Sequence, residues 1–349
     1  MINIKVPARI CFYGDHQDYL GLPVIAGTIN RFIQLKATPN NSKCFRIELL
    51  DLKETISIAV NDSLEEIEDE DYFRSCLAIL LTKNFEFLQG YDVEISGDIP
   101  VNAGLSSSSA LVVCWLRFLI EIQEKPISIT DLELGHLAYE AEVEYFKQPG
   151  GLMDQYTIAQ GGMLFIDTNT GKSNSLSPKI GTLIVAESGI AKQTLEVLSN
   201  AKLYAQRAIE VVQESFPDFN LKQATLTDYS KYKSLVPDKF QNHWYATIHN
   251  FEITKKAKLE LKKLNPDINV LGELMNAHQK ILQEQIENTP KEMIKMMDAA
   301  REAGALGAKI IGSGGGGCMV AITGNNTREK VIDAFLASGA VKAYEVQLT

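Results

Sequence analysis

No cysteine of this chain has a closely spaced partner, and this absence excludes two common kinds of stabilised domain. The five cysteines are Cys11, Cys44, Cys76, Cys114 and Cys318. Disulfide frameworks use even numbers of cysteines, and structural zinc sites use pairs separated by only about two to four residues. We therefore expect free thiols and a reducing compartment, of which the cytoplasm is the simplest.

The sequence also lacks segments that would lead a protein to or through a membrane. No uncharged apolar run approaches the roughly 18 residues that span a bilayer. The first residues, Met1–Val6, alternate as a β-strand does and lack the charged, apolar and small-residue order of a signal peptide. We expect neither a membrane partner nor an export signal.

Clusters of basic residues are missing as well. The net charge is −10, and lysines and arginines do not gather beside aromatic residues. A nucleic acid would have to approach against a repulsive field, so we do not expect one as a partner. The chain has 349 residues, 45% of them hydrophobic, which is long enough for two domains and a substantial core.

Hydrophobic periodicity predicts a β-rich beginning and a helix-rich second half. The predicted strands are residues 3–12, 24–36, 45–50, 54–60, 91–95, 163–166, 181–186, 308–311, 318–322 and 343–348. The predicted helices are residues 72–88, 107–121, 128–145, 193–212, 243–263, 271–286, 290–303 and 328–337. Because helices and strands do not alternate strictly, the pattern favours an α+β fold.

The most informative stretch is a loop of small and hydroxyl residues, Pro100–Ala110, which runs into the apolar segment Leu111–Leu116. Such a strand-to-helix turn directs unpaired backbone N–H groups at one spot, where a phosphate can bind. Gly104 lets the backbone approach that anion closely, and one of the serines could reach a magnesium ion. Taken alone, the stretch is equally consistent with a serine-rich N-cap at the start of an ordinary buried helix.

A second stretch carries polar groups directly after a predicted strand. The strand breaks at Gly14, and Asp15, His16 and Asp18 follow before Gly21. Two carboxylates and an imidazole can hydrogen-bond the hydroxyls of a polyol. Aspartate and glycine also favour plain polar turns, so this run is weak by itself.

A third stretch combines two carboxylates with a break in the chain. Glu142 lies on a predicted helix, and Asp154 follows the pair Gly150–Gly151. A carboxylate at the start of the next segment can ligate magnesium or take a proton. It can also simply cap the next helix, which is the preferred interpretation if nothing else matches.

The fourth stretch, Gly312–Cys318, lies between two predicted apolar strands and holds five glycines within six positions. So many glycines cost conformational entropy, and a plain turn needs only one or two. We infer that another part of the molecule, or a ligand, approaches this backbone closely.

Together the four stretches resemble the GHMP kinases, the superfamily of galactokinase, homoserine kinase, mevalonate kinase and phosphomevalonate kinase, over nearly the whole chain. Within it, Gly14–Tyr19 is similar to the galactokinase signature Gly-Glu-His-Thr-Asp-Tyr, with Asp15 replacing Glu and Gln17 replacing Thr. Gly151–Tyr156 is similar to Gly-Ile-Met-Asp-Gln-Phe of the same group. These signatures indicate a sugar substrate.

The resemblance implies a two-domain α+β GHMP kinase fold. Residues 1–165 would form an N-terminal α/β domain whose phosphate-binding loop belongs to a left-handed βαβ-type unit, and residues 166–349 a ferredoxin-like C-terminal domain. It also implies a cytoplasmic phosphotransferase, a monomer or homodimer, that uses ATP and Mg²⁺ to phosphorylate a sugar hydroxyl. The anomeric C1 hydroxyl is the preferred acceptor.

The resemblance further implies roles for individual residues. Asp154 would be the base or orienter of the attacking hydroxyl, and Arg9 would keep it ionised and stabilise the transferring phosphoryl group. The sugar would be held by Asp15, His16, Asp18 and Gly151, and magnesium by Ser108 and Glu142. The nucleotide phosphates would be held by Gly104, Leu105, Ser106, Ser107, Ser108, Ser109, Gly314 and Gly315.

Some features depart from the galactokinase pattern. Asp15 is one methylene shorter than the usual Glu, and both Leu20–Pro23 and Glu187–Thr194 resemble mevalonate or heptose kinases instead. Tyr204 is a candidate for the tyrosine that galactokinases place against the sugar. A mevalonate or heptose-type kinase is therefore the enzymatic alternative. An inactive sugar and ATP sensor is the alternative of another class, although the catalytic and magnesium residues that such a sensor would lose are present.

Overall fold

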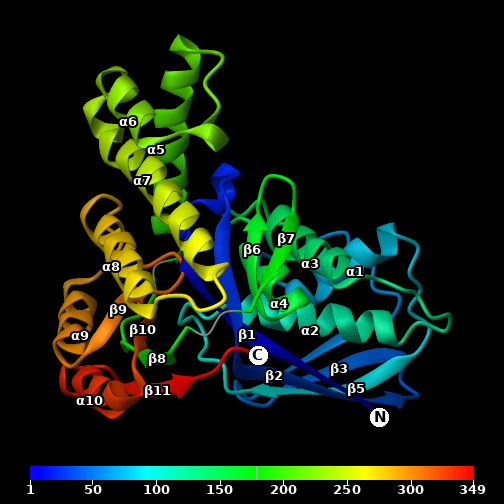
Figure 1. Ribbon diagram of the computed structural model, residues 1–349. Helices are drawn as coiled ribbons and strands as arrows, with labels where there is room; N and C mark the ends of the chain where they lie inside the picture. Colours follow the sequence, from blue (N-terminus) through cyan, green and yellow to red (C-terminus); the bar gives the residue numbers. More distant parts are fainter. Residues whose placement is uncertain (178–179, 193) are drawn as a thin grey trace.

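The computed structural model describes residues 1–177, 180–192 and 194–349, and it has two lobes, each built on its own sheet (Figure 1). The larger sheet has the order β4-β3-β5-β2-β6-β7, with β1 paired to β2. Its strands are β1 (Ile2–Tyr13), β2 (Val24–Asn40), β3 (Cys44–Leu49), β4 (Glu54–Ala59), β5 (Gly90–Gly97), β6 (Met163–Asp167) and β7 (Lys172–Leu176). All neighbouring strands pair antiparallel except β3 and β5.

The strand β1 ends at the boundary between the lobes, where the polar turn Asp15–Asp18 follows it. It pairs with β2 from Ile2 to Tyr13 and then breaks at Gly14, whose φ is 97°. A Cβ on Gly14 would lie 2.9 Å from the carbonyl oxygen of Pro23, so only glycine fits this tight break. The turn that follows is thereby fixed against the start of β2.

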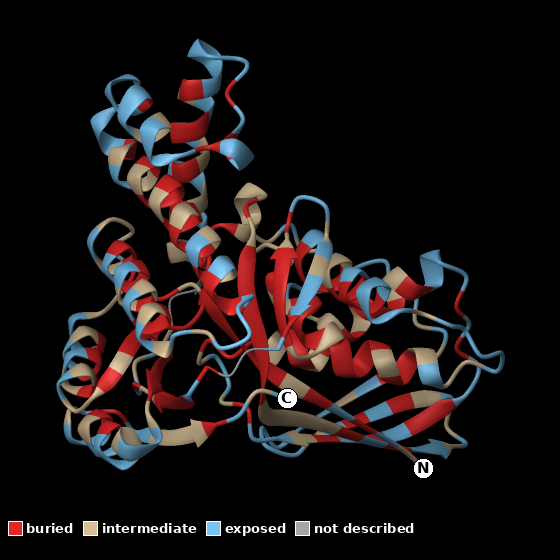
Figure 2. Cartoon of the chain, viewed as in Figure 1, coloured by how far each residue is buried: buried red, intermediate tan, exposed pale blue. Residues whose placement is uncertain are grey.

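Helices α1 (Tyr72–Thr82), α2 (Ser107–Glu121), α3 (Asp131–Tyr139) and α4 (Met153–Gln160) complete the first lobe. The helix α2 packs on β1 and β2 and is buried along most of its length (Figure 2). Thr130 and Glu133 form a capping box that begins α3. A π-helical segment, Glu140–Glu144, follows it directly. Such bulges occur often at functional sites, and this one carries Glu142.

The second lobe has a four-stranded antiparallel sheet in the order β11-β8-β10-β9. Its strands are β8 (Thr182–Glu187), β9 (Ala305–Ile310), β10 (Cys318–Thr323) and β11 (Lys342–Val346), and its helices are α8 (Ile268–Glu284), α9 (Lys291–Glu302) and α10 (Arg328–Ala337). Helices separate β8 from β9 and β10 from β11, which is the β-α-β-β-α-β pattern of a ferredoxin-like domain. The expected fold of this lobe is confirmed.

Helices α5 (Thr194–Ser215), α6 (Leu226–Tyr232) and α7 (Asp238–Leu261) project away from both sheets (Figure 1). They have a small core of their own around Trp244, and the tip of the projection is largely exposed (Figure 2). Short helical turns lie at Asp18–Leu20, Leu221–Gln223, Lys233–Leu235 and Asn325–Thr327. Within the described part of the chain, no helix combines the length and apolarity needed to cross a bilayer.

The predicted elements agree with the structure where periodicity is long, and they differ at a few places. Helix α1 ends at Thr82 rather than at residue 88, because Asn84 adopts a left-handed conformation with φ 64°. The elements β7, α4 and α6 were not predicted. Gln193, at the predicted start of the next helix, lies outside the described residues. The two sheets divide between Leu176 and Thr182, whereas the boundary expected at 165/166 falls inside β6.

Candidate active site

A cavity of about 590 Å³ lies at the junction of the two lobes and collects most of the predicted site residues. Both lobes and all four motif stretches contribute to its walls. The residues of its lining that bear on the chemistry are Arg9, Asp15, His16, Asp18, Gly104, Ser106, Ser107, Ser108, Ser109, Glu142, Gly151, Asp154, Lys192, Gly312 and Ser313. Stretches far apart in sequence thus converge as the motifs predict.

The serine-rich loop leads into α2 without capping it. Ser106 occupies the N-cap position in a left-handed conformation, φ 59°, and makes no capping hydrogen bond. Its hydroxyl donates to the Asp154 carboxylate instead. The first turn of α2, with Ser107, Ser108 and Ser109, therefore faces the cavity with its N–H groups available to an anion. Ser106 therefore does not act as a simple cap of α2, and the anion site stays a prediction.

Arg9 and Asp154 form a bidentate ion pair at the centre of the cavity. Arg9 Nε donates to Asp154 Oδ1 over 2.7 Å and Nη2 to Oδ2 over 2.6 Å. Arg9 Nη1 donates to the carbonyl of Gly104 over 2.6 Å, which ties the pair to the phosphate loop. Burial alone would raise the pKa of Asp154, but Arg9, Ser106 and Lys192 together hold that pKa below its usual value of 3.8. The carboxylate is ionised and 27% exposed, so it can meet a substrate hydroxyl.

Asp18 lies directly over the backbone of Gly151. A Cβ on Gly151 would collide with the Asp18 carboxylate, so a side chain at this position would displace it. Burial, and then the negative charge of Asp154, raise the pKa of Asp18 from 3.8 to about 6. Asp18 thus lies beside the Arg9–Asp154 pair and has no cationic partner among the residues that the structure describes, so its carboxylate is available to accept hydrogen bonds from hydroxyl groups.

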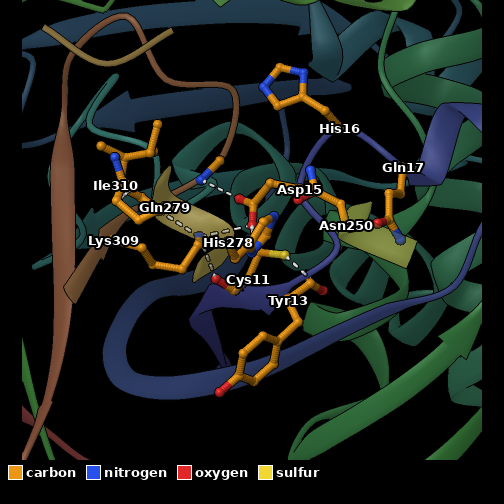
Figure 3. A network of polar contacts seen from close by, with 12 residues as sticks. Cys11, Tyr13, Asp15, His16, Gln17, Asn250, His278, Gln279, Lys309 and Ile310 are labelled. Carbon is orange, nitrogen blue, oxygen red and sulfur yellow. Dashed lines mark hydrogen bonds and ion pairs between the residues drawn. The ribbon is translucent and has the colours of Figure 1, made fainter. Parts of the chain in front are cut away.

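Asp15 borders the cavity, but its side chain is almost fully buried. Lys309 Nζ lies 2.8 Å from Asp15 Oδ2, and the backbone N–H of Gly312 donates to Oδ1 over 3.1 Å. Figure 3 shows Asp15, Lys309 and His278 pointing toward one another, and the His278 ring nitrogen Nδ1 lies 3.9 Å from the carboxylate. The side chains of all three are no more than 1% exposed. Asp15 was expected to hold a sugar hydroxyl. In the structure, both oxygens of its carboxylate already have partners within the protein, Lys309 and the backbone of Gly312.

His16 is the next residue and points away from this network (Figure 3). Its φ of 62° is unusual for a non-glycine residue. Its Nε2 lies 3.0 Å from the carbonyl of Ser313, and its Nδ1 lies 3.0 Å from the hydroxyl of Tyr19. The side-chain amide nitrogen of Asn288 also lies 3.0 Å from Nε2. His16 thus links the first lobe to the glycine-rich loop of the second.

Glu142 and Ser108 provide oxygen ligands of the kind that Mg²⁺ prefers. Glu142 is buried, and burial raises the pKa of its carboxyl, partly offset by Gln155, Ser108 and Ser109. Gln155 Nε2 donates to it over 2.7 Å. Among the residues that the structure describes, no group of three or more histidine, cysteine or acidic side chains is arranged to hold a metal ion. A two-ligand site beside a phosphate loop fits magnesium, which usually keeps waters and phosphate oxygens as its other ligands.

The glycine-rich loop packs closely against its neighbours, as its composition predicts. A Cβ on Gly317 would lie 2.6 Å from the carbonyl oxygen of Ala103, and one on Gly104 would lie 2.7 Å from that of Ile311. The two loops are therefore pressed together. Gly314 packs against Asn288, and the N–H of Gly315 donates to the Asn288 carbonyl over 2.7 Å.

Several expected residues do not line the cavity. Gly314 and Gly315 face Asn288, and it is Gly312 and Ser313 that reach the cavity from this loop. Leu105 is buried behind it, and Tyr204 packs against Phe240 and His243 on the projecting helices.

Sequence reasoning missed two lysines, Lys309 and Lys192. A lysine inside the apolar run Ala308–Ile311 is a readable signal of a buried charge with a partner. Lys192 lies in the stretch Glu187–Thr194, which resembles mevalonate or heptose kinases, but that resemblance assigns it no role because only the tertiary fold brings it into the cavity.

Two family models match this chain. The model for the GHMP kinases N terminal domain matches residues 71–162, and that for the GHMP kinases C terminal matches residues 258–341. Together they cover about half of the sequence. Galactokinase from Thermococcus kodakarensis is 27% identical over 338 residues, covering 95% of this chain and 91% of that protein. Galactokinase from Clostridium perfringens is 26% identical over 347 residues, covering 93% and 86%.

Solved structures share the fold. Lactococcus lactis galactokinase complexed with galactose superposes with a TM-score of 0.87 at 22% identity, over 99% of this chain and 93% of that one. Mevalonate kinase from Methanococcus jannaschii superposes with a TM-score of 0.73 at 18% identity, over 100% and 98%. Both lobes of the chain, and not one alone, therefore match a known two-lobed architecture.

Proposed function

This chain belongs to the GHMP kinase family of phosphotransferases, and on that premise we propose that it transfers the γ-phosphoryl group of Mg-ATP to the anomeric C1 hydroxyl of a free sugar. The observation that carries the proposal is the bidentate Arg9–Asp154 pair. It is joined on one side to the phosphate loop at Gly104 and lies near Asp18 on the other. The Asp154 carboxylate thus lies between the loop that would hold the nucleotide phosphates and the Asp18 side chain that would bind sugar hydroxyls.

The chemistry asks for positioning and charge rather than covalent participation. The acceptor oxygen forms a bond to the γ-phosphorus as the bond to the β–γ bridging oxygen breaks. The hydroxyl proton passes to Asp154, which Arg9 keeps ionised beforehand. A carboxylate with a lowered pKa is a weak base, and a hemiacetal hydroxyl is more acidic than an ordinary alcohol. This match supports the anomeric position as the acceptor.

The galactokinase relatives and the carboxylate of Asp18 support a sugar as the substrate. Asp18 is half-buried beside Gly151 and is paired with no cation among the described residues. A neutral polyol can donate hydroxyl protons to such a group, whereas an anionic substrate such as mevalonate would be repelled by it. We propose Asp18, the Gly151 backbone and His16 as the sugar contacts, with Asp15 acting behind them.

The donor set also supports a magnesium requirement. Ser108 and Glu142 would hold the ion, and the bound ion would neutralise phosphate charge during transfer. The raised pKa of Glu142, caused by its burial, means that its carboxylate gains from any cation that binds beside it. The N–H groups at the start of α2 would hold the phosphates themselves.

An ATP-consumption screen tests the proposal. The acceptors are galactose, galacturonate, glucuronate, arabinose, fucose, N-acetylhexosamines, a heptose phosphate and mevalonate, each with and without magnesium. We expect a magnesium-dependent signal on a free sugar, and phosphorus NMR of the product identifies a C1 phosphate by its coupling to the anomeric proton. Signal on mevalonate alone would replace the sugar proposal. ATP binding without any turnover would favour the sensor.

A further inference from the structure

Lys192 lies where the two glycine-containing loops meet, and the motifs assign it no role. It follows β8 on the segment that leads to α5, and it lines the cavity. A Cβ on Gly312 would lie 3.4 Å from Lys192 Nζ and 3.7 Å from Arg9 Nη2. A Cβ on Gly104 would lie 3.5 Å from the same Nζ. The ammonium of the second lobe and the guanidinium of the first thus flank one point beside the phosphate loop.

The positive charge of Lys192 is only partly balanced by the acidic groups around it. The charge of Arg9 is matched by Asp154 through two hydrogen bonds. Burial, and then repulsion by Arg9, lower the pKa of Lys192 to about 8, and the acidic groups Asp154 and Asp15 offset this only in part. An ammonium group that is buried and repelled by a neighbouring cation is stabilised when an anion enters the cavity. The terminal phosphate of a nucleotide is an anion of suitable charge.

We propose that Lys192 is a second catalytic cation, which contacts the γ-phosphoryl group and stabilises the charge on its oxygens during transfer. This inference rests on the proposed kinase function. In the step, the acceptor oxygen bonds to the γ-phosphorus, ADP leaves with the electron pair of the broken bond, and the hydroxyl proton goes to Asp154. Lys192 keeps its proton throughout. Cations aimed at the transferring group are a general device of phosphoryl transfer.

The position also explains why the second lobe is needed for the chemistry. Arg9 and Asp154 come from the first lobe, whereas Lys192, Gly312 and Ser313 come from the second. A nucleotide held between the α2 N-terminus and Lys192 would contact both lobes at once. The phosphate site is therefore complete only when the lobes are closed on each other as they are in this structure.

Three variants test the role of Lys192. Lys192→Met removes the charge, Lys192→Arg keeps a cation, and Lys342→Met is a matched control, because Lys342 is 68% exposed on the second sheet. We expect Lys192→Met to lower kcat by about 10²–10³-fold, the effect of losing one group that stabilises transition-state charge. Lys192→Arg should recover at least a tenth of the wild-type kcat, and Lys342→Met should match wild type. Equal kcat in Lys192→Met and wild type would overturn the proposal.

The pH profile separates this role from a structural one. Lys192 must carry its proton to bind phosphate, so kcat/KM for ATP should fall above pH about 8 in the wild type. Bound phosphate stabilises the ammonium, so the fall in kcat should come at higher pH. Arg9 from β1, Asp15 from the turn after it, Asp154 from α4 and Cys318 from β10 face Lys192. Burial raises the pKa of Cys318 to about 12, so it does not titrate in this range.

The alkaline fall should disappear in Lys192→Arg, since arginine remains charged. Its persistence in that variant would overturn the proposal. Direct calorimetric titration with Mg-ATP, which needs no sugar, gives the same comparison of affinity against pH. If no sugar is phosphorylated but wild-type affinity falls above pH about 8 and Lys192→Arg affinity does not, the proposed acceptor fails while the phosphate contact of Lys192 stands. If both affinities change alike, the contact of Lys192 fails.

Discussion

Two ion pairs lie near Gly312, at the start of the glycine-rich loop, and they differ in exposure. Arg9–Asp154 opens to the cavity, with 27% of the aspartate side chain exposed. Asp15–Lys309 is sealed, with exposures of 1% and 0%. Both pairs hold an ionised carboxylate, and both carboxyls have a pKa below 3.8. The difference indicates that exposure, and not ionisation, decides which of two similar carboxylates can act on a substrate.

The geometry of each cation fits its part in this comparison. The Arg9 fork holds both oxygens of Asp154 and leaves a third donor for Gly104, so it fixes the carboxylate in one orientation. Lys309 acts as a compact charge whose ammonium also donates to the carbonyls of Cys11 and Ile310. The first pair fixes the orientation of a carboxylate that is open to the cavity, and the second joins the turn after β1 to β9.

The largest effect is expected from the exposed pair. Asp154→Asn removes the proton acceptor but keeps the shape of the side chain, so kcat should fall by about 10²–10⁴-fold while ATP affinity changes little. Steady-state kinetics with the identified sugar and calorimetry with Mg-ATP measure the two quantities. Turnover at the wild-type rate would show that Asp154 is not the proton acceptor. The exposed pair would then have no catalytic role to distinguish it from the buried pair.

The sealed pair should matter for stability. Lys309→Met leaves the Asp15 carboxylate buried without its cation, which should lower the free energy of unfolding by about 3–5 kcal/mol. Urea unfolding of this variant, of Asp15→Asn and of the double variant gives a double-mutant cycle. We expect the double variant to be more stable than the sum of the single losses predicts. Strict additivity would show that the two charges do not depend on each other.

Much of this site could be predicted from the sequence, because the chemistry-bearing residues lie at the ends of strongly periodic elements. The helix predicted at residues 107–121 matches α2, and that at 328–337 matches α10. Both are long apolar or amphipathic runs with clear ends. The glycines were informative for a related reason, since Gly104 and Gly317 lie where another backbone leaves no room for a side chain.

Other features depend on contacts between segments distant in sequence. The strand β7, Lys172–Leu176, has one buried residue and no apolar alternation, so it forms only because β6 offers an edge. The capture of Asp15 by Lys309 joins residues almost 300 positions apart. A motif identifies which residue types gather, but it does not identify which carboxylate is exposed to the ligand and which is covered by a neighbouring strand.

A substitution that adds a methyl group beside Asp18 tests whether this carboxylate contacts the sugar. Gly151→Ala puts a methyl group where the Asp18 carboxylate lies, so Asp18 must move away from the catalytic pair. We expect KM for the sugar to rise by about 10-fold or more, the effect of losing one or two hydrogen bonds to a charged group, with KM for ATP nearly constant. Gly150→Ala is the matched variant, because its Cβ would meet only Val143 at 3.8 Å and should have a smaller effect. Equal changes in both variants would argue against a sugar contact at Asp18.

Asp18 is a third carboxylate, without a cationic partner in the described part of the chain, and it should show the opposite pH behaviour to the two pairs. Its pKa is raised to about 6, so between pH 3.8 and about 6 the folded protein holds a proton that the unfolded chain has released. Stability therefore falls as pH rises through this window, whereas the low pKa values of Asp15 and Asp154 make their contributions fall only in acid. Asp18→Asn removes the buried charge and should raise the melting temperature at pH 7 by a few degrees, with the gain vanishing below pH about 4.

The same change should weaken catalysis, since the ionised form accepts the sugar hydroxyls. Wild-type kcat/KM for the sugar should fall as pH drops below about 6, while Asp18→Asn should be about 10-fold lower at pH 7 and flat across that range. Thermal unfolding and kinetics on the same samples measure both effects. A variant that is more stable and less active would mean that the chain tolerates a half-buried carboxylate without a cation because the substrate supplies its partners. A variant that loses stability would instead group Asp18 with Asp15, as a carboxylate that serves the fold.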